Sequence, residues 1–325
     1  MNHQKYDTNG LIVLWALAES GIGGLLHALH LPLTGIFVGG FAVIAISLLA
    51  WYSDSPKEIL KALSIVLAVK LIVSPHSPWQ AYVAVAFQGL LGYWLYYRKN
   101  QFKIKIAFFT VLCLLESALQ KILIAVLVFG TDFFKAIDKA AMQIAQSLGF
   151  DLSTSLVMTV FLIYAVAHLA VGIFLAWYIP TLPKKIDAFT EIASQHNRDE
   201  TDLTINKKRK WWFIYGMIGI SILGLNYLLP VDDKINLTLL VTRVIVVTLI
   251  LTFVVGPLIK WAVLRYLVKD SPYQHSIAEV LAKLPTYQQR MMENYRLATH
   301  HYQGYKALTF FILGMLVFSL KSHER

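Results

Sequence analysis

The sequence predicts an all-α, polytopic integral membrane protein, and three observations support this. The chain is 57% hydrophobic and only 15% charged, whereas soluble domains carry roughly 25% charged residues. Its mean hydropathy is +0.58. Two long stretches, 71–97 and 152–183, contain no Asp, Glu, Lys or Arg. An uncharged apolar run of about 18 residues is typical of a helix that spans a membrane.

We expect nine membrane-spanning helices, of which six form an N-terminal bundle and three a C-terminal module. The third and ninth runs are short, but a short span can cross when flanking residues snorkel or the bilayer thins. In chain order, the expected spans are Leu11–Leu29, Gly35–Trp51, Ile59–Val73, Trp79–Tyr97, Ile106–Phe129, Thr154–Tyr178, Trp211–Leu229, Leu237–Leu258 and Ala307–Leu320.

The basic residues predict how these spans are oriented. With alternating spans, Lys57, Arg98, Lys99 and the basic run 207–210 all fall on one side. The positive-inside rule makes that side cytoplasmic. The N-terminus is then cytoplasmic and the C-terminus external, in a bacterial inner membrane. The formal net charge of +10 fits loops that contact anionic lipid headgroups, and we see no basic motif typical of nucleic-acid binding.

The loops divide the expected spans into modules. Residues 1–180 form the six-helix module, 181–210 a basic cytoplasmic linker, and 211–325 the three-helix module. Within the last module, the cytoplasmic segment 268–306 has apolar residues at helical spacing. It therefore predicts one or two amphipathic helices, lying on the membrane surface or offered to a partner. On this segment we expect a partner-docking surface at Met291, Met292 and Tyr295, because methionine surfaces adapt to partners.

Polar side chains inside the spans are the candidates for function. Such groups are costly in a bilayer, so each is a functional hypothesis by default. Several spans contribute them near one predicted external mouth, close to the turn "SPHSPW". We expect a solute-binding site lined by Glu19, His27, Lys70, His76, Gln80, Gln88, Glu116, Gln120 and His168.

The same residues have structural interpretations. Glu19 or Glu116 can pair with Lys70 or Lys121, because a buried charge needs a partner. The glutamines can serve as hydrogen-bonding contacts between helices, and His168 as a satisfied interhelical bond. The histidines near the mouth lack a carboxylate at ligand spacing, so neither a metal site nor a cofactor is expected. The single cysteine excludes internal disulfides.

The first span also carries a ladder of small residues, and such ladders let helix backbones approach closely. The contact is either with another subunit or with helices of the same chain. The ladder consists of Ala16, Ser20, Gly24 and Ala28.

These features resemble the substrate-binding S components of energy-coupling factor transporters, over roughly residues 8–180. The resemblance rests on the six spans, the external polar pocket, the small-residue ladder, "LPLTGIFVGGFAV" and "SPWQAYVAVAFQGLLGYWL". It implies capture of a vitamin or similar micronutrient, a membrane T component packed on the ladder, and cytoplasmic ATPase subunits. Residues 205–320 resemble a reduced T component, but "LATHHYQGY" lacks the Ala-Arg-Gly-type tripeptide of that family's coupling helices.

Three functions follow as hypotheses. The first is a transport subunit that binds a small solute from outside and passes it inward with partner subunits. Under this hypothesis the chain has no catalytic chemistry of its own and is not an enzyme. No GxxxxGK[ST] motif is present, so any ATP hydrolysis must come from a partner subunit. The second is an intramembrane enzyme of lipid or isoprenoid metabolism, with Glu19, Glu116 and His168 as acid–base groups. The third is a structural subunit of a larger membrane complex.

Overall fold

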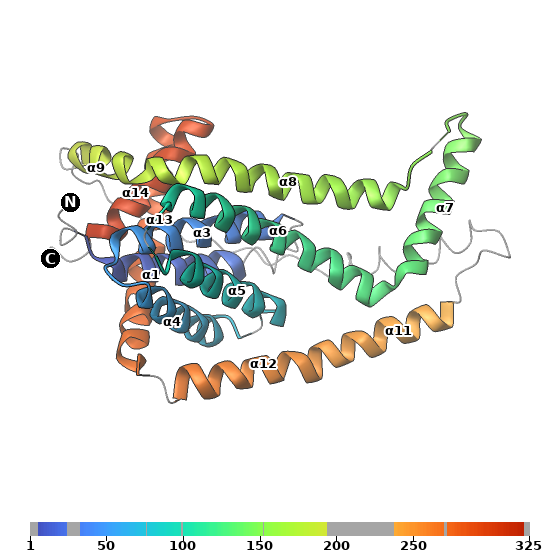
Figure 1. Cartoon of the computed structure of the whole chain (residues 1–325), viewed down its shortest axis with the longest axis horizontal. Coiled ribbons are helices and arrows are strands. Elements are labelled where there is room, and N and C mark those ends of the chain that lie inside the picture. Colours follow the sequence, from blue (N-terminus) through green and yellow to red (C-terminus); the bar gives the residue numbers. More distant parts are fainter. Residues whose placement is uncertain are drawn as a thin grey trace. The chain divides into compact units, whose positions relative to one another are not determined.

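The computed structural model describes residues 6–24, 33–75, 77–98, 100–151, 153–193, 237–269 and 272–321 (Figure 1). All regular secondary structure in these ranges is helical, which confirms the all-α part of the predicted fold class for the described chain. The elements in order are α1 (Thr8–Leu17), the π-helix η2 (Ala18–Ile22), α3 (Thr34–Tyr52), α4 (Lys57–Val73), α5 (Trp79–Tyr96), α6 (Phe102–Phe129), α7 (Thr131–Ser147), α8 (Leu156–Tyr178), the 3₁₀-helix η3 (Ile179–Thr181), α9 (Leu182–Ala193), α11 (Leu237–Ile250), the π-helix η5 (Leu251–Val255), α12 (Gly256–Val263), the π-helix η6 (Leu264–Lys269), α13 (Gln274–His301) and α14 (Tyr305–Lys321).

Within the described chain, four helices are long and apolar enough to cross a membrane. They cover Thr34–Tyr52, Phe102–Phe129, Leu156–Phe189 and Leu239–Leu267. Several long apolar helices of this kind are typical of a multi-pass membrane protein. Seven of the expected spans coincide with helices, and the first, Leu11–Leu29, overlaps α1 and η2 but continues over residues 25–29, which lie outside the described residues. The seventh, Trp211–Leu229, lies outside the described residues, so nine spans stay a prediction. The Asp7 N–H donates to the Leu320 carbonyl oxygen at 3.0 Å, so the start of α1 and the end of α14 lie together, which differs from the prediction that they lie on opposite sides of the membrane.

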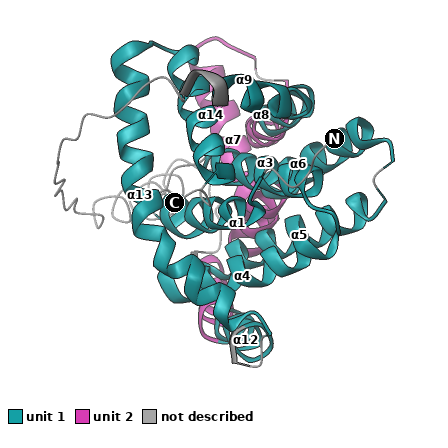
Figure 2. Cartoon of the chain, turned by 90° about the vertical axis from the view of Figure 1, so that its left-hand side faces the viewer, with its two compact units in different colours: residues 1–118, 167–196, 254–325 teal, residues 119–166, 197–253 magenta. Residues whose placement is uncertain are grey.

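The chain forms two compact units (Figure 2). Unit 1 comprises residues 1–118, 167–196 and 254–325, and unit 2 comprises 119–166 and 197–253. These boundaries pass through α6 and α8, and they do not follow the division expected around 181–210. The reason lies in unit 1, where the N-terminal α1 packs against the C-terminal helices α13 and α14.

Helix α1 forms the centre of unit 1 because it is apolar on every side. All seven residues from Leu11 to Leu17 are buried, as expected for a helix without a polar face. Gly10 allows its closest contact with the C-terminal helices. A Cβ at Gly10 would lie 1.7 Å from the Ser319 carbonyl oxygen and 2.7 Å from the Tyr287 hydroxyl. Only glycine lets the two backbones approach so closely.

Helix α13 is the amphipathic helix expected within 268–306. Its apolar stripe includes Ile277, Val280 and Leu284, all of which are buried. The stripe packs against α1, α4 and α14, and α13 runs across the ends of other unit 1 helices (Figures 1 and 2). Much of the apolar face is therefore covered by the chain itself.

The last long helix extends further than its expected span, Leu237–Leu258. It continues as α12 and η6 to Lys269. Pro257 lacks an N–H and cannot make the usual helical bond, and the π-helix η5 lies directly before α12. Lys260, expected beyond the span, lies inside it and donates a hydrogen bond to the Pro75 carbonyl oxygen at 2.5 Å. A cation of the C-terminal part thus contacts the "SPHSP" turn.

Candidate functional site

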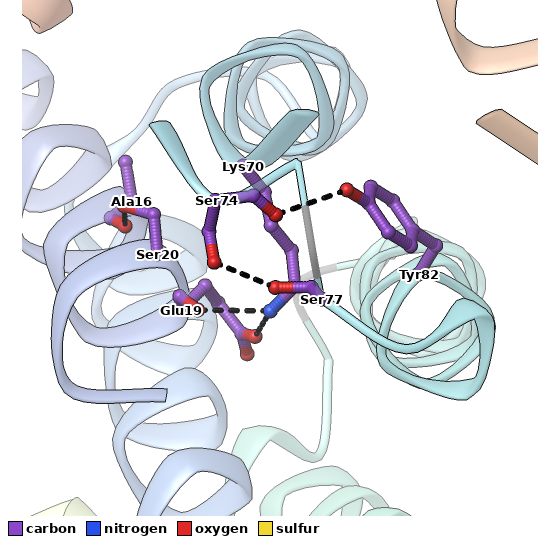
Figure 3. Close-up of polar contacts among 7 residues, drawn as sticks. All are labelled: Ala16, Glu19, Ser20, Lys70, Ser74, Ser77 and Tyr82. Carbon is purple, nitrogen blue, oxygen red and sulfur yellow. Dashed lines mark hydrogen bonds and ion pairs between the residues drawn. The ribbon is translucent and has the colours of Figure 1, made fainter. Parts of the chain in front are cut away.

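The predicted site residues include a buried ion pair in unit 1 (Figure 3). Lys70 Nζ lies 2.8 Å from Glu19 Oε2. The two side chains are only 1% and 3% exposed. The sequence left the partner of Lys70 open between Glu19 and Glu116, and the structure pairs it with Glu19. We call this contact the Glu19–Lys70 pair.

The π-helix η2 explains a second bond within this pair. The Gly23 N–H donates to the Ala18 carbonyl, five residues back, and is not used by the Glu19 carbonyl as it would be in an α-helix. That carbonyl accepts a hydrogen bond from Lys70 Nζ at 2.9 Å. Lys70 also lies in the last turn of α4, where the helix dipole favours a cation. The Lys70 ammonium group therefore donates hydrogen bonds to both the backbone carbonyl and the side-chain carboxylate of Glu19.

Serine residues of the neighbouring turn lie beside the pair (Figure 3). Ser74 and Ser77 share a hydrogen bond of 2.8 Å between their hydroxyls, and Ser77 is 5% exposed. Tyr82 reaches back to the Ser74 carbonyl at 3.5 Å. The turn that follows α4 is thus held by its own side chains, as well as by Lys260.

A second group of polar side chains gathers against the glycines of α3. Glycines Gly35 and Gly39 are one turn apart, so they lie on one helix face. A Cβ at Gly35 would lie 3.5 Å from His168 Nε2 and 3.6 Å from Ser117 Oγ. A Cβ at Gly39 would lie 3.5 Å from both Gln88 Nε2 and Ser117 Oγ. We call Gln88, Ser117 and His168 the Gln88 cluster.

The Gln88 cluster is withdrawn from solvent but differs from the ion pair in its hydrogen bonding. Gln88 is 2%, Ser117 7% and His168 0% exposed. The buried Oε1 of Gln88 has no hydrogen-bond partner within the described chain. An unsatisfied buried acceptor costs about 1–3 kcal/mol. This amide oxygen is therefore available to a donor from outside the described residues.

Other predicted site residues are placed less centrally. Gln80 and Glu116 are half-buried, and Glu116 Oε2 is a buried atom without a hydrogen-bond partner in the described residues. Gln120 belongs to unit 2. His27 and His76 lie outside the described residues. Across the described ranges, no group of three His, Cys, Asp or Glu side chains is placed to hold a metal ion.

The expected partner contacts divide between buried and exposed positions. Ala16 and Ser20 are 0% and 5% exposed, which favours the internal-packing interpretation of the small-residue ladder. Gly24 is half-buried and faces Ser74, and Ala28 lies outside the described residues. The docking surface expected on α13 stays a prediction. Its three residues are the partly buried Met291, which packs on the core, and the exposed Met292 and Tyr295.

Sequence reasoning missed Ser117 and the role of the two α3 glycines. The spacing of Gly35 and Gly39 was a usable signal, because glycines one turn apart mark a face that neighbouring side chains can approach. Ser117 carried no such signal, since one serine in an apolar helix usually bonds its own backbone.

No protein-family model matches the chain, and neither a curated protein nor a solved structure matches it. The case for function therefore rests on the residues described above.

Proposed function

We propose that the chain is a membrane transport subunit, and that its Gln88 cluster binds a small, micronutrient-like solute. The observation that supports this most is the buried Gln88 Oε1, which has no hydrogen-bond partner in the described chain. Ser117 and His168 lie against the same glycine face and add a hydroxyl and an imidazole. Together the three side chains offer both donors and acceptors.

The charges of the Glu19–Lys70 pair are also compatible with solute binding at the Gln88 cluster. The Glu19–Lys70 pair neutralises itself, so neither group needs the solute as a counter-ion. The proposed site is therefore the Gln88 cluster, which is smaller than the nine-residue site expected from the sequence. The Glu19–Lys70 pair then has a structural role. As expected from the resemblance to S components, a membrane T component and ATPase subunits would supply the energy for transport.

Mass spectrometry of solutes that co-purify with the protein tests the proposal. The parent, Gln88→Leu and His168→Phe are purified in detergent, and small molecules extracted from each are compared without a preselected target. Loss of one hydrogen bond to the solute weakens binding by about 1–3 kcal/mol, which is roughly a 5- to 150-fold change in affinity. We expect at least one solute of the parent to be depleted to that extent in both variants.

Ser47→Ala is the matched control. Ser47 bonds the Tyr96 hydroxyl at 2.9 Å, so this change also removes a buried hydrogen bond of the bundle, but outside the Gln88 cluster. It should leave the solute in place. If the parent and all three variants carry the same solutes, the cluster is an interhelical contact and the proposal is wrong.

A further inference from the structure

Helix α7 lies where the sequence predicted only an external connection between two spans. It links the end of α6 to the start of α8 and runs across both within unit 2 (Figure 1). One face carries Phe133, Ile137 and Ile144, and another carries Lys135, Lys139 and Gln143. A helix with such opposite faces lies at a boundary between apolar and aqueous surroundings.

Specific contacts fix α7 to both neighbours. Asp138 Oδ1 accepts a hydrogen bond of 2.9 Å from the Val157 N–H at the start of α8, an arrangement that satisfies a helix N-terminus. The Phe134 ring lies 5.5 Å from the Phe161 ring of α8, and Phe133 stacks on Phe129 of α6 at 5.1 Å. These contacts therefore fix the position and the rotation of α7 relative to the neighbouring ends of α6 and α8.

The apolar face of α7 continues into an open groove of about 530 Å³. Ile144 is 48%, Leu148 67% and Phe150 68% exposed. Among the described residues, none covers much of this apolar surface, whereas the apolar stripe of α13 is buried by α1, α4 and α14. The groove is lined by Ala141, Ile144, Ala145, Leu148, Phe150 and Asp151.

Two features of unit 2 indicate what covers the groove. The flanking helices are candidate membrane spans with exposed apolar residues, such as Leu123 at 63% and Leu162 at 62%, so the groove continues a surface that suits acyl chains. At the end of α6, Arg243 Nε lies 3.4 Å from the Leu127 carbonyl oxygen. Arg243 is itself the fifth residue of the candidate span Leu239–Leu267, and a long basic side chain close to the end of a membrane helix extends toward the lipid headgroups.

We infer that α7 lies in the interface of the membrane and that its groove holds phospholipid acyl chains. Lys135 and Lys139 then face the headgroups and water, on the opposite side of the helix. This assignment concerns unit 2 and does not depend on the solute proposed for the Gln88 cluster.

Nitroxide spin labels test the inference in the full chain, reconstituted into phosphatidylcholine vesicles. Labels are attached at Ile144→Cys and Leu148→Cys in the groove, and at Gln143→Cys and Gln146→Cys as matched controls on the polar face. All four parent residues are exposed, so the substitutions disturb little packing. The one native cysteine, Cys113, is buried, and labelling of the unmodified chain measures its background.

The readout is collision of each label with oxygen, which concentrates in lipid, and with a water-soluble nickel chelate. We expect the ratio of oxygen to nickel accessibility to be severalfold higher at both groove positions than at both controls. Nickel-accessible groove labels would place the groove in water. Groove labels that reach neither reagent would show that protein covers it, and either result overturns the inference.

Discussion

The Glu19–Lys70 pair and the Gln88 cluster are buried to a similar degree, yet they differ in the hydrogen-bond partners that the protein supplies. Lys70 donates hydrogen bonds to both the carboxylate and the backbone carbonyl of Glu19. Gln88 presents an amide oxygen that no described protein group meets. Burial of a full charge without a partner is prohibitive, whereas an unmet amide costs only about 1–3 kcal/mol. The difference indicates that the charged residues maintain the bundle, and the uncharged amide is the group that we propose binds a ligand.

The largest effect is expected when the pair is broken. Lys70→Met leaves Glu19 buried without a counter-charge, which should lower the free energy of unfolding by about 3–5 kcal/mol. Replacing both residues, as Lys70→Met with Glu19→Leu, removes the stranded charge and should recover most of that loss. Denaturant titration in detergent micelles measures both. Equal stability of the single variant and the parent would contradict the assignment of the pair as structural.

The next effect concerns the spacing of the helices that assemble the Gln88 cluster. Gly172 lies one turn beyond His168, and a Cβ there would meet the Val111 Cα at 3.2 Å. Because that atom belongs to the backbone of α6, Gly172→Ala should destabilise by about 1–3 kcal/mol.

Gly40→Ala is the control for that change. Its Cβ would meet only Leu175 Cδ1, at an ordinary 3.6 Å. Alanine is favoured over glycine inside a helix by roughly 0.5–1 kcal/mol, so this variant should equal or exceed the parent in the same titration. If both variants lose similar stability, the close approach of α8 to the α6 backbone at Gly172 is not the reason for the loss.

Gln88→Met should change stability by less than about 1 kcal/mol, because it removes an unsatisfied acceptor while keeping a side chain of similar length. The same titration measures this variant beside Lys70→Met. If Gln88→Met loses as much stability as Lys70→Met, Gln88 is a structural residue like Lys70. The two regions would then not differ in role.

The smallest effect is expected at a solvated polar contact, which serves as a reference. Burial first, and then the hydrogen bond to Asp187 and its charge, raise the pKa of Tyr6 from 10.0 to about 12. The folded state thus holds the proton more tightly than the unfolded state. The stabilisation is complete below pH 10 and is lost as the pH rises toward about 12.

Tyr6→Phe removes this contact and should cost less than about 1 kcal/mol at pH 8, as is usual for exposed polar pairs. The difference in unfolding free energy from the parent should shrink as the pH approaches 12. A difference that stays constant up to pH 12 would contradict the raised pKa of Tyr6, and no difference at pH 8 would mean that the contact with Asp187 does not stabilise the chain.

The sequence predicted the helices well because hydropathy reports directly on the solvent that a helix meets. It placed Glu19, Lys70, Gln88 and His168 among the functional candidates for the same reason. It left the partner of Lys70 undecided, because no local spacing relates residues that are 51 positions apart. That pairing depends on how η2 and α4 pack, and the local sequence of neither helix specifies it.

Two other differences have physical reasons of the same kind. An apolar stripe predicts that a helix lies at a boundary, but it does not say what covers the stripe. The stripe of α13 is covered largely by the chain itself, whereas the described residues leave the apolar face of α7 exposed. The small-residue ladder assumed a regular helix, whereas the π-helix η2 changes the helical register between Ala16 and Gly24. Gly24 therefore faces Ser74, away from the line that the spacing predicted.

The π-helix η2 also has a consequence for how the chain tolerates changes in length. Deleting one residue from an α-helix rotates everything beyond the deletion by about 100°. A π-turn already contains one residue more than an α-turn, so removing Gly21 would restore a regular helix and return the Glu19 carbonyl to its own backbone. Lys70 would keep only the carboxylate. We expect natural relatives that differ by a single-residue deletion in this helix to carry it between Ala18 and Ile22, together with a change at position 70.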